Sequence, residues 1–175
     1  DVPFLRPAFL AQDDSVTEDV LRHCIHWLEE KEKSYYDILL YLQLTDPFRR
    51  HNIIERVIRR LLDSDNLDTV FAAYPEHKNY WSKTNNGYQP FDRRGHLPRQ
   101  QKQHIYREDT GIACATRIDF VRKGRRIGDR VEIIEHISGF DFIDIHDPLD
   151  FWLANQIIKE FGEYPNTLTE KEKIV

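Results

Sequence analysis

The alternation of two kinds of apolar segment constrains the fold of this chain more than any other feature. Short apolar runs of the kind that form buried strands lie at 37–43, 68–74, 105–116, 130–136 and 140–145, and Gly111 predicts an irregularity in the third. Apolar side chains recur with the period of a helix at 15–31, 52–63 and 148–161, and Ser15 and Glu18 predict a capping box at the start of the first. Strands that alternate with helices are typical of an α/β domain, so we predict a mixed, mainly parallel sheet flanked by helices.

One long polar stretch interrupts this alternation. The chain of 175 residues suits a single domain, which we take as 1–175. Residues 75–104 are rich in Pro, Asn, Gly and Gln, and they are too numerous for an ordinary connection. They also carry aromatic residues that favour protein interfaces, namely Tyr80, Trp81, Tyr88 and Phe91. We therefore expect 75–104 to be an arm through which the chain forms a homodimer.

Charge and hydropathy argue against two classes of partner. The net charge is −5 and the 25 basic residues are scattered, which gives no support for nucleic-acid binding. No apolar run approaches the ~18 residues of a membrane span. Cys24 and Cys114 lie on apolar-patterned segments, so we interpret both as buried thiols rather than as a disulfide or a catalytic group. Buried thiols are typical of the reducing cytoplasm, which is the location we expect.

The most informative short stretch is Phe-Ile-Asp-Ile-His-Asp-Pro-Leu-Asp at 142–150. It predicts a strand that runs directly into a helix, with Asp147 at the N-cap, Pro148 at the first helical position and Asp150 completing a capping box. Asp144 would then lie at the carboxyl end of a strand, where ligands gather in open α/β sheets. A carboxylate there can hold a divalent cation against a phosphate. The same nine residues also allow both acids only to cap the helix.

Five stretches, taken together, carry a family resemblance. They are Val-Pro-Phe-Leu-Arg-Pro-Ala-Phe-Leu-Ala at 2–11, Leu-Gln-Leu-Thr-Asp-Pro-Phe-Arg at 42–49, Tyr-Arg-Glu-Asp-Thr-Gly at 106–111, Arg-Ile-Gly at 126–128, and Ile-Asp-Ile-His-Asp-Pro-Leu-Asp-Phe at 143–151. Each is weak alone. In this order, over nearly the whole chain, they resemble the motifs of the acylneuraminate cytidylyltransferase family, the enzymes that make CMP-activated sialic and related acidic sugars.

The resemblance implies a fold and an activity. The fold is the three-layer, Rossmann-like fold of nucleotide-diphospho-sugar transferases, and the activity is CTP-dependent formation of a CMP-sugar from an acidic, nonulosonate-type sugar, with Mg²⁺. Family members also carry an earlier segment with a Gly- and Lys/Arg-rich loop around the nucleotide phosphates, which we expect before residue 1. Two alternatives stay open: a truncated or degenerate, non-catalytic homologue that acts as a dimeric sugar-binding or assembly module, and a transferase of the same fold that activates another sugar.

The metal site is expected at the last motif. The family's first aspartate there helps to hold Mg²⁺, and this role carries over to Asp144 as the catalytic metal ligand. The family's second aspartate is His146 in this chain, and imidazole is a poor ligand for a hard cation. Either Asp144 and water suffice, or Asp147 joins them, or the site prefers Mn²⁺, or activity is lost. The interpretation of His146 that we favour over metal ligation is a helix-start residue that bonds the backbone.

Two substrate contacts are expected near the strand ends. Gln43 matches a family glutamine that contacts the sugar, and a side-chain amide can donate and accept at once. Without the resemblance, a strand-end glutamine bonding the backbone is an equal interpretation. Asp109 stands where the family has asparagine, beside the substrate. Asp46 adds a charge near an anionic substrate, so we expect it to point away or to cap the next helix.

Basic residues of the arm are expected to bind the sugar carboxylate. Arginine suits this role because its planar fork contacts both oxygens. Arg99 aligns without gaps with the family arginine that binds the carboxylate, often across the dimer. Arg94 resembles the same motif with a gap, and Lys78 resembles a further family sugar contact. For each of them the alternative is a solvent-exposed loop charge.

Overall fold

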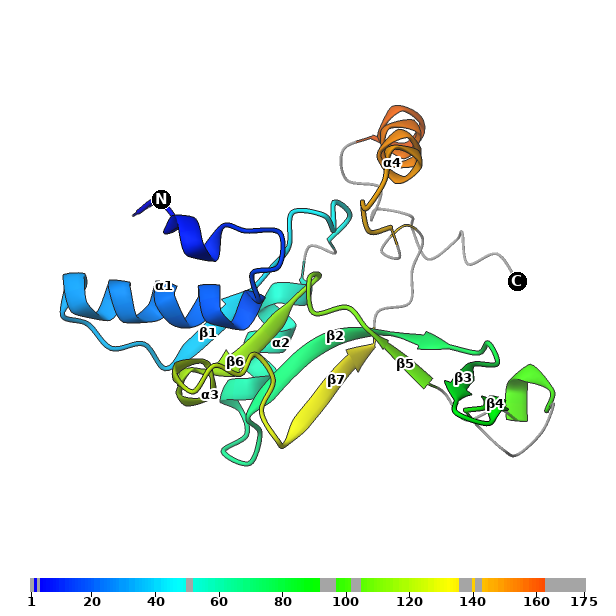
Figure 1. Cartoon of the computed structure of the whole chain (residues 1–175), viewed down its shortest axis with the longest axis horizontal. Coiled ribbons are helices and arrows are strands. Elements are labelled where there is room, and N and C mark those ends of the chain that lie inside the picture. Colours follow the sequence, from blue (N-terminus) through cyan, green and yellow to red (C-terminus); the bar gives the residue numbers. More distant parts are fainter. Residues whose placement is uncertain are drawn as a thin grey trace.

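The computed structural model describes residues 2, 4–49, 52–91, 97–101, 105–135, 140 and 143–162, apart from the side chain of residue 99, and these form a mixed α/β structure (Figure 1). Its helices are η1 (Ala8–Leu10), α1 (Thr17–Glu32), α2 (Ile53–Leu62), η2 (Arg99–Gln101), α3 (Ile118–Arg122) and α4 (Pro148–Phe161). Its strands are β1 (Ile38–Tyr41), β2 (Thr69–Glu76), β3 (Trp81–Thr84), β4 (Gly87–Pro90), β5 (Ile105–Glu108), β6 (Cys114–Arg117) and β7 (Val131–Glu135).

The main sheet is less parallel than the sequence predicts. Strand β6 lies between β1 and β2 and is antiparallel to both. Strand β7 pairs with β2 in parallel, and this is the one parallel pairing among the described strands. Strands β1, β2 and β7 still run in the same direction, because the antiparallel β6 separates β1 from β2. The expected mainly parallel pairing is therefore wrong, and a mixed sheet is what forms.

The run expected as one strand at 105–116 is two strands separated by a bulge. Residues 109–113 lie opposite a single residue of β2, Ala72. The main-chain N of Asp109 donates to the Ala72 carbonyl at 3.1 Å, and the Ala72 N donates to the Ala113 carbonyl at 2.9 Å. Both strands therefore follow the same edge of β2. The glycine inside this run predicted the irregularity, and the structure confirms it.

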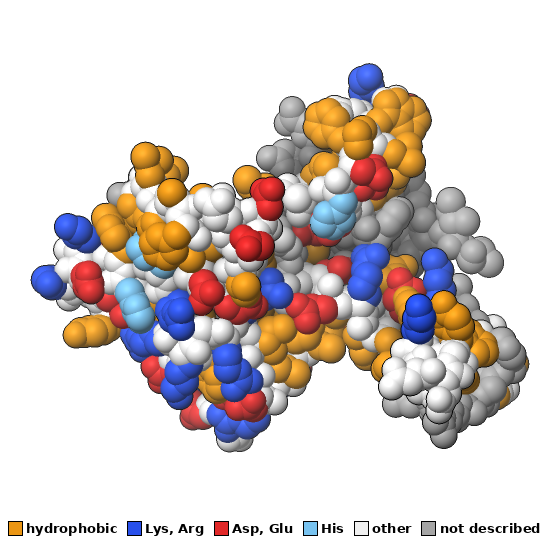
Figure 2. Space-filling model, viewed as in Figure 1, with side chains coloured by type: hydrophobic (Ala, Val, Ile, Leu, Met, Phe, Trp, Pro, Cys, Tyr) orange, Lys and Arg blue, Asp and Glu red, His pale blue; other side chains and the backbone are white. Residues whose placement is uncertain are grey.

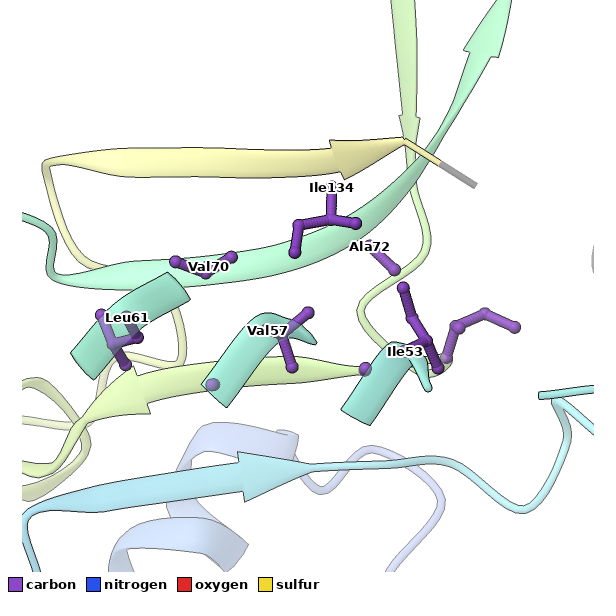
Figure 3. Close-up of a cluster of buried hydrophobic side chains, with 9 residues drawn as sticks. Ile53, Val57, Leu61, Val70, Ala72 and Ile134 are labelled. Atoms are coloured by element: carbon purple, nitrogen blue, oxygen red, sulfur yellow. The ribbon is translucent and has the colours of Figure 1, made fainter. Parts of the chain in front are cut away.

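Helix α2 covers one face of the sheet and forms the main core. Its residues Ile53, Val57 and Leu61 recur every four positions, so they share one side of the helix, and all three are fully buried. They face Val70 and Ala72 of β2 (Figure 3). The same cluster includes Ile112, Ala113, Ala115 and Ile134. The predicted helix at 52–63 is confirmed, because its apolar stripe has a matching apolar sheet face.

Helices α1 and α3 pack together beside the other face of β1. Ile25 of α1 and Ile118 and Val121 of α3 form a buried cluster against which Leu39 of β1 packs. Leu40, the next residue of β1, instead packs against the α2 cluster. Alternate residues of a strand point to opposite faces, so β1 is covered on both sides.

The expected capping box at the start of α1 does not form. The N-cap position is Val16, and no side chain caps the helix. The Ser15 hydroxyl instead accepts a hydrogen bond from the main-chain N of Gln12 at 3.0 Å. The Glu18 carboxylate lies 3.7 Å from Nε of Arg126. Tertiary and turn contacts therefore use both groups that the capping box needs.

Both cysteines are free thiols, as the sequence predicts. Cys114 is fully buried, and this burial raises its pKa to about 11, so its thiolate is scarce at neutral pH. Cys24 on α1 is only half-buried, which corrects the expectation that it lies in the core, and burial raises its pKa as well.

The strand expected at 140–145 is not present in its described part. Residues 143–146 have no regular structure, and 141–142 lie outside the described residues. The main-chain N of Ile145 donates to the carbonyl of Thr45 at 2.8 Å, so this segment lies against the loop after β1. An apolar run forms a strand only where a sheet edge accepts it, and here the segment meets a loop.

Helix α4 is weakly covered. Ala154 and Ile157 pack against Phe48 and Ile143, and these four residues form a small buried cluster. Other apolar side chains of the helix are exposed, as Figure 2 shows over α4: Leu149, Phe151, Trp152, Ile158 and Phe161. No helix within the described ranges has the length and apolarity that a membrane crossing requires.

The expected arm has structure of its own. Strands β3 and β4 pair as an antiparallel hairpin that forms a separate two-stranded sheet. Its exposed aromatic residues include Trp81, Tyr88 and Phe91. Residues 92–96 and 102–104 lie outside the described residues. Whether the arm dimerises the chain stays a prediction.

Candidate functional site

The candidate site begins where the loop after β1 meets the 109–113 bulge. The main-chain N of Gln43 donates to the Gly111 carbonyl at 2.8 Å. Position 111 has no room for a side chain, because a Cβ there would lie 2.1 Å from Oδ2 of Asp46 and 2.4 Å from Oε1 of Gln43. The two polar side chains therefore converge on a backbone that only glycine leaves open.

An arginine fastens these two segments to each other. Nε of Arg49 donates to the Ile112 carbonyl at 2.8 Å, and Nη2 donates to the carbonyls of Gly111, at 3.2 Å, and Gln43. Burial lowers the pKa of Arg49 from its ordinary value, and the nearby charge of Asp46 partly offsets this. The guanidinium therefore donates hydrogen bonds to main-chain carbonyls on both sides of the junction.

Asp46 corrects an expectation from the sequence. It was expected to point away from the site or to cap the next helix. It is instead only 5% exposed, and its carboxylate faces Gly111. The N-cap of α2 is Asn52, which makes no capping bond through its side chain. The cation of Arg49 offsets part of the cost of burying this acid, so the inward orientation is stable.

Two buried oxygen atoms at this junction have no hydrogen-bond partner among the described residues. They are Oγ1 of Thr45 and Oδ1 of Asp144. The bond from the Ile145 N to the Thr45 carbonyl places the two residues beside each other, although they are far apart in sequence. Buried polar atoms in native proteins nearly always have a partner. Two orphaned oxygens in one place therefore indicate a site for a ligand, an ion or water.

The other oxygen of Asp144 is engaged by His146. Nε2 of the imidazole lies 2.6 Å from Oδ2 of Asp144, and both side chains are partly exposed. The main-chain N of His146 donates to Oδ2 of Asp150 at 3.0 Å. The imidazole therefore holds the Asp144 carboxylate, and within the described residues it has no bond to the backbone of the kind that one interpretation of the sequence predicts.

Asp147 and Asp150 form the capping box that the sequence predicts. Oδ1 of Asp147 accepts from the main-chain N of Leu149 at 2.7 Å and of Asp150 at 2.9 Å. Oδ2 of Asp150 accepts in return from the main-chain N of Asp147 at 3.1 Å. For Asp147 the capping interpretation is thus confirmed, and service as a metal ligand would compete with these bonds.

The residues present fit a sparse cation site at most. No group of three or more His, Cys, Asp or Glu in the described part of the chain could hold a metal ion. The orphaned Oδ1 of Asp144 is a suitable hard ligand. Mg²⁺ is often bound by one or two carboxylates and completed by water and substrate phosphates. The donor set therefore fits a cation that arrives with a phosphate-bearing substrate.

Asp109 and Lys78, two of the predicted substrate contacts, have different surroundings. The Asp109 carboxylate is largely buried and accepts from Nε and Nη2 of Arg107 at 3.2 and 3.1 Å, so an ion pair occupies it at the start of the bulge. Lys78 is exposed beyond the end of β2. It follows Ala72 by six residues, a span of up to about 20 Å for extended chain. No described contact joins Lys78 to Gln43 in the same chain.

The two predicted arginines cannot be placed at the site. Arg94 lies outside the described residues. Arg99 is the first residue of η2, and its side chain also lies outside what the structure describes. Both stay predictions.

Thr45 and Arg49 are residues of the site that the sequence alone did not reveal. Both belong to the motif at 42–49, directly after the half-buried strand β1. That position carried the available signal, because ligands gather at the carboxyl ends of strands in α/β sheets. The contacts of these residues with 109–113 and with Ile145 depend on tertiary structure, which no local pattern specifies.

Comparison with known proteins adds no family assignment. No protein-family model matches the chain, and no curated protein is significantly similar to it. Function is therefore argued from the motifs and from the contacts between them.

Proposed function

We propose that this protein is a nucleotidyltransferase that activates an acidic, sialic-acid-like 2-keto-3-deoxy sugar with CTP, giving a CMP-sugar and pyrophosphate. One observation carries the proposal: four of the five motif stretches, 42–49, 106–111, 126–128 and 143–151, contact one another. Gln43 bonds Gly111, Thr45 bonds Ile145, and Nη2 of Arg126 lies 3.3 Å from Oε1 of Glu108. Stretches that match a family by chance have no reason to meet in space.

The arrangement of the elements supports the fold that the motifs imply. Helices cover β1 on both faces, and β1, β2 and β7 share one direction. On this basis we assign the three-layer, Rossmann-like fold of nucleotide-diphospho-sugar transferases. The site then lies at the carboxyl end of β1, where such sheets place their ligands.

The chemistry is an in-line displacement at the α-phosphorus of CTP. The sugar hydroxyl forms a bond to phosphorus, the bond to the leaving pyrophosphate breaks, and the hydroxyl proton passes to solvent. When bound, Mg²⁺ or Mn²⁺ screens the charge on the phosphate oxygens. Oδ1 of Asp144 would hold it, while His146 orients the carboxylate through Oδ2. The Gln43 amide would hold the sugar.

The arm supplies the remaining sugar contacts in a homodimer. Its exposed aromatic residues suit an interface. Arg99 is assigned to the sugar carboxylate of the partner subunit's site, and Arg94 is the next candidate. Lys78, which has no described contact with Gln43 in its own chain, would also act across the interface. The two free thiols suit a reducing compartment, so we place the protein in the cytoplasm.

A second candidate is a homologue that dimerises and binds the acidic sugar without catalysis. It is favoured by the change at the last motif. His146 replaces the family's second carboxylate, and Asp147 is engaged by the helix cap. The intact mass and N-terminal sequence of the native protein would show whether a Gly- and Lys-rich nucleotide loop precedes residue 1, as the first candidate requires.

Pyrophosphate release tests the proposal directly. Protein expressed from its complete gene is assayed with CTP and a panel of acidic 2-keto-3-deoxy sugars. Asp144→Ala is expected to lower turnover at least ~100-fold, because it removes the cation ligand. Asp65→Ala, at an exposed acid outside the five motif stretches, is the matched control and should leave turnover unchanged. His146→Asp restores the family pattern and should keep or improve Mg²⁺-supported turnover.

Two outcomes would contradict parts of this proposal. Full activity of Asp144→Ala would show that the metal assignment is wrong. If the wild-type protein releases no pyrophosphate with any acidic sugar, catalysis is excluded. Calorimetric titration with the same sugars then decides whether the non-catalytic binding function remains.

A further inference from the structure

Arg49 joins two segments that lie far apart in the sequence. Its acceptors include the main-chain carbonyls of Gln43 after β1 and of Gly111 and Ile112 in the 109–113 bulge. The main-chain N of Gln43 also donates to the Gly111 carbonyl, so this carbonyl accepts hydrogen bonds from both Gln43 and Arg49. A guanidinium can do this because it carries five donors in a fixed plane.

These contacts fix the distance at which the polar side chains of the site approach the bulge. Oε1 of Gln43 and Oδ2 of Asp46 both lie within 2.4 Å of the place that a Cβ at residue 111 would occupy. A small shift of the bulge would therefore move the backbone relative to the Gln43 amide. Nε and Nη2 of Arg49 donate to carbonyls on both segments, so a change at Arg49 would act on the segments it joins.

We infer that Arg49 is a positioning residue, which holds Gln43 and the 109–113 bulge as one unit and so sets the geometry of the sugar-binding end of the site. The inference rests on the proposed function, because Gln43 is taken as the sugar contact. It assigns Arg49 no contact with the substrate.

Lysine cannot replace this arginine. A lysine ammonium carries its three donors on one nitrogen, whereas Nε and Nη2 of Arg49 reach carbonyls on both segments. Arg49→Lys would leave at least one of these carbonyls without its donor and loosen the bulge. Because the residue positions a contact that holds the sugar equally before and during reaction, its loss should raise the sugar KM and leave kcat nearly unchanged.

The test compares Arg49→Lys and Arg49→Gln with Arg59→Lys in protein expressed from its complete gene. Arg59 is the matched control, since its exposed guanidinium pairs with exposed Glu55 on the same helix, at 2.5 Å. Steady-state kinetics give KM separately for CTP and for the sugar. Hydrogen–deuterium exchange of the unliganded protein reports opening of residues 109–113.

The expected result is specific to Arg49 and to the sugar. Arg49→Lys should raise the sugar KM about tenfold, with kcat and the CTP KM changed less than about twofold, and Arg49→Gln should do at least as much. Exchange at 109–113 should accelerate in both variants. Arg59→Lys should change none of these quantities. Because KM does not depend on the amount of active enzyme, partial misfolding cannot imitate the effect.

Other outcomes overturn the inference in distinguishable ways. An unchanged sugar KM in Arg49→Lys shows that Arg49 does not position the sugar contact. Equal rises in the KM of CTP and of sugar indicate a general structural role instead. If the wild-type protein itself turns nothing over, the proposed function fails and this role of Arg49 fails with it.

Discussion

The core under α2 and the site at the end of β1 are neighbours with opposite construction. In the core, Ile53, Val57 and Leu61 are fully buried among apolar residues of the sheet (Figure 3). At the site, Thr45 and Asp144 each keep a buried oxygen without a partner in the described structure. The core is stabilised by the burial of apolar surface, which has no preferred direction. The site depends on hydrogen bonds of defined geometry, and these two buried oxygen atoms remain able to bond a ligand, an ion or water.

This difference predicts how each region responds to substitution. Loss of apolar volume should damage the core and leave a cavity, because the surrounding residues relax only in part. Loss of an unpaired oxygen at the site should cost the fold little, because no bond is broken. Stability therefore reports on the core, and ligand binding reports on the site.

The largest expected effect comes from opening the core. Leu61→Ala removes a fully buried side chain and should lower the free energy of unfolding by about 2–5 kcal/mol. Leu62→Ala, the adjacent and exposed leucine, is the matched control and should stay within about 0.5 kcal/mol. Urea titration followed by circular dichroism measures both. Equal losses in the two variants would contradict the placement of the core on one face of α2.

A buried acid with satisfied oxygens should give an intermediate effect. Asp68 accepts from the guanidinium of Arg130 and from the main-chain N of Asp129 and of Arg130. These bonds lower its pKa from 3.8 to about 2. Asp68→Asn weakens bonds to a charged acceptor, so it should cost about 1–3 kcal/mol at neutral pH.

The same acid should shape the stability in acid. Because the folded pKa of Asp68 lies below the unfolded one, its stabilisation is fully present above about pH 4 and is lost as the pH falls through about 2. Denaturant titrations between pH 5 and 2 should show a flatter pH dependence for Asp68→Asn than for the wild type. Asp65→Asn, exposed on the same turn, should keep the wild-type slope, and a common slope for all three proteins would refute the assignment.

The smallest expected effect is at the site itself. Thr45→Val removes a buried hydroxyl that has no partner in the described structure, so stability should be unchanged or should rise by up to about 1 kcal/mol. Thr116→Val is the matched control. Its buried hydroxyl donates to the Arg126 carbonyl at 2.6 Å, so that loss should cost about 1–3 kcal/mol. Thermal unfolding measures both variants.

One outcome would contradict the expected difference between the Thr45 and Thr116 hydroxyls. If Thr45→Val destabilises the protein as much as Thr116→Val does, the Thr45 hydroxyl is bonded in solution, and the junction has no spare polar capacity. The proposed site would then lose one of its two orphaned oxygens.

Local sequence patterns were sufficient to predict several elements of the structure. The four-residue spacing of Ile53, Val57 and Leu61 predicted α2 and its buried face. The acids around Pro148 predicted the capping box of α4, and the glycine at 111 predicted the interruption between β5 and β6. Each of these rests on interactions within a few residues, which the sequence states directly.

Other features depended on partners far along the chain. The insertion of β6 between β1 and β2 changed the expected sheet, and the run at 140–145 found a loop instead of a strand neighbour. Asp46 turned inward because the tertiary fold supplies the charge of Arg49 and the open backbone of Gly111.

The sequence by itself determined the buried side of α2 and the start of α4, and it showed which motifs suggest a function. The tertiary structure alone decided which motif residues meet: Gln43 with Gly111, Thr45 with Ile145, and Arg49 with the carbonyls of the bulge. The physical reason is the sequence separation over which each kind of interaction acts. Helix periodicity and capping act over three or four residues, whereas a buried carbonyl accepts any donor that the fold brings near.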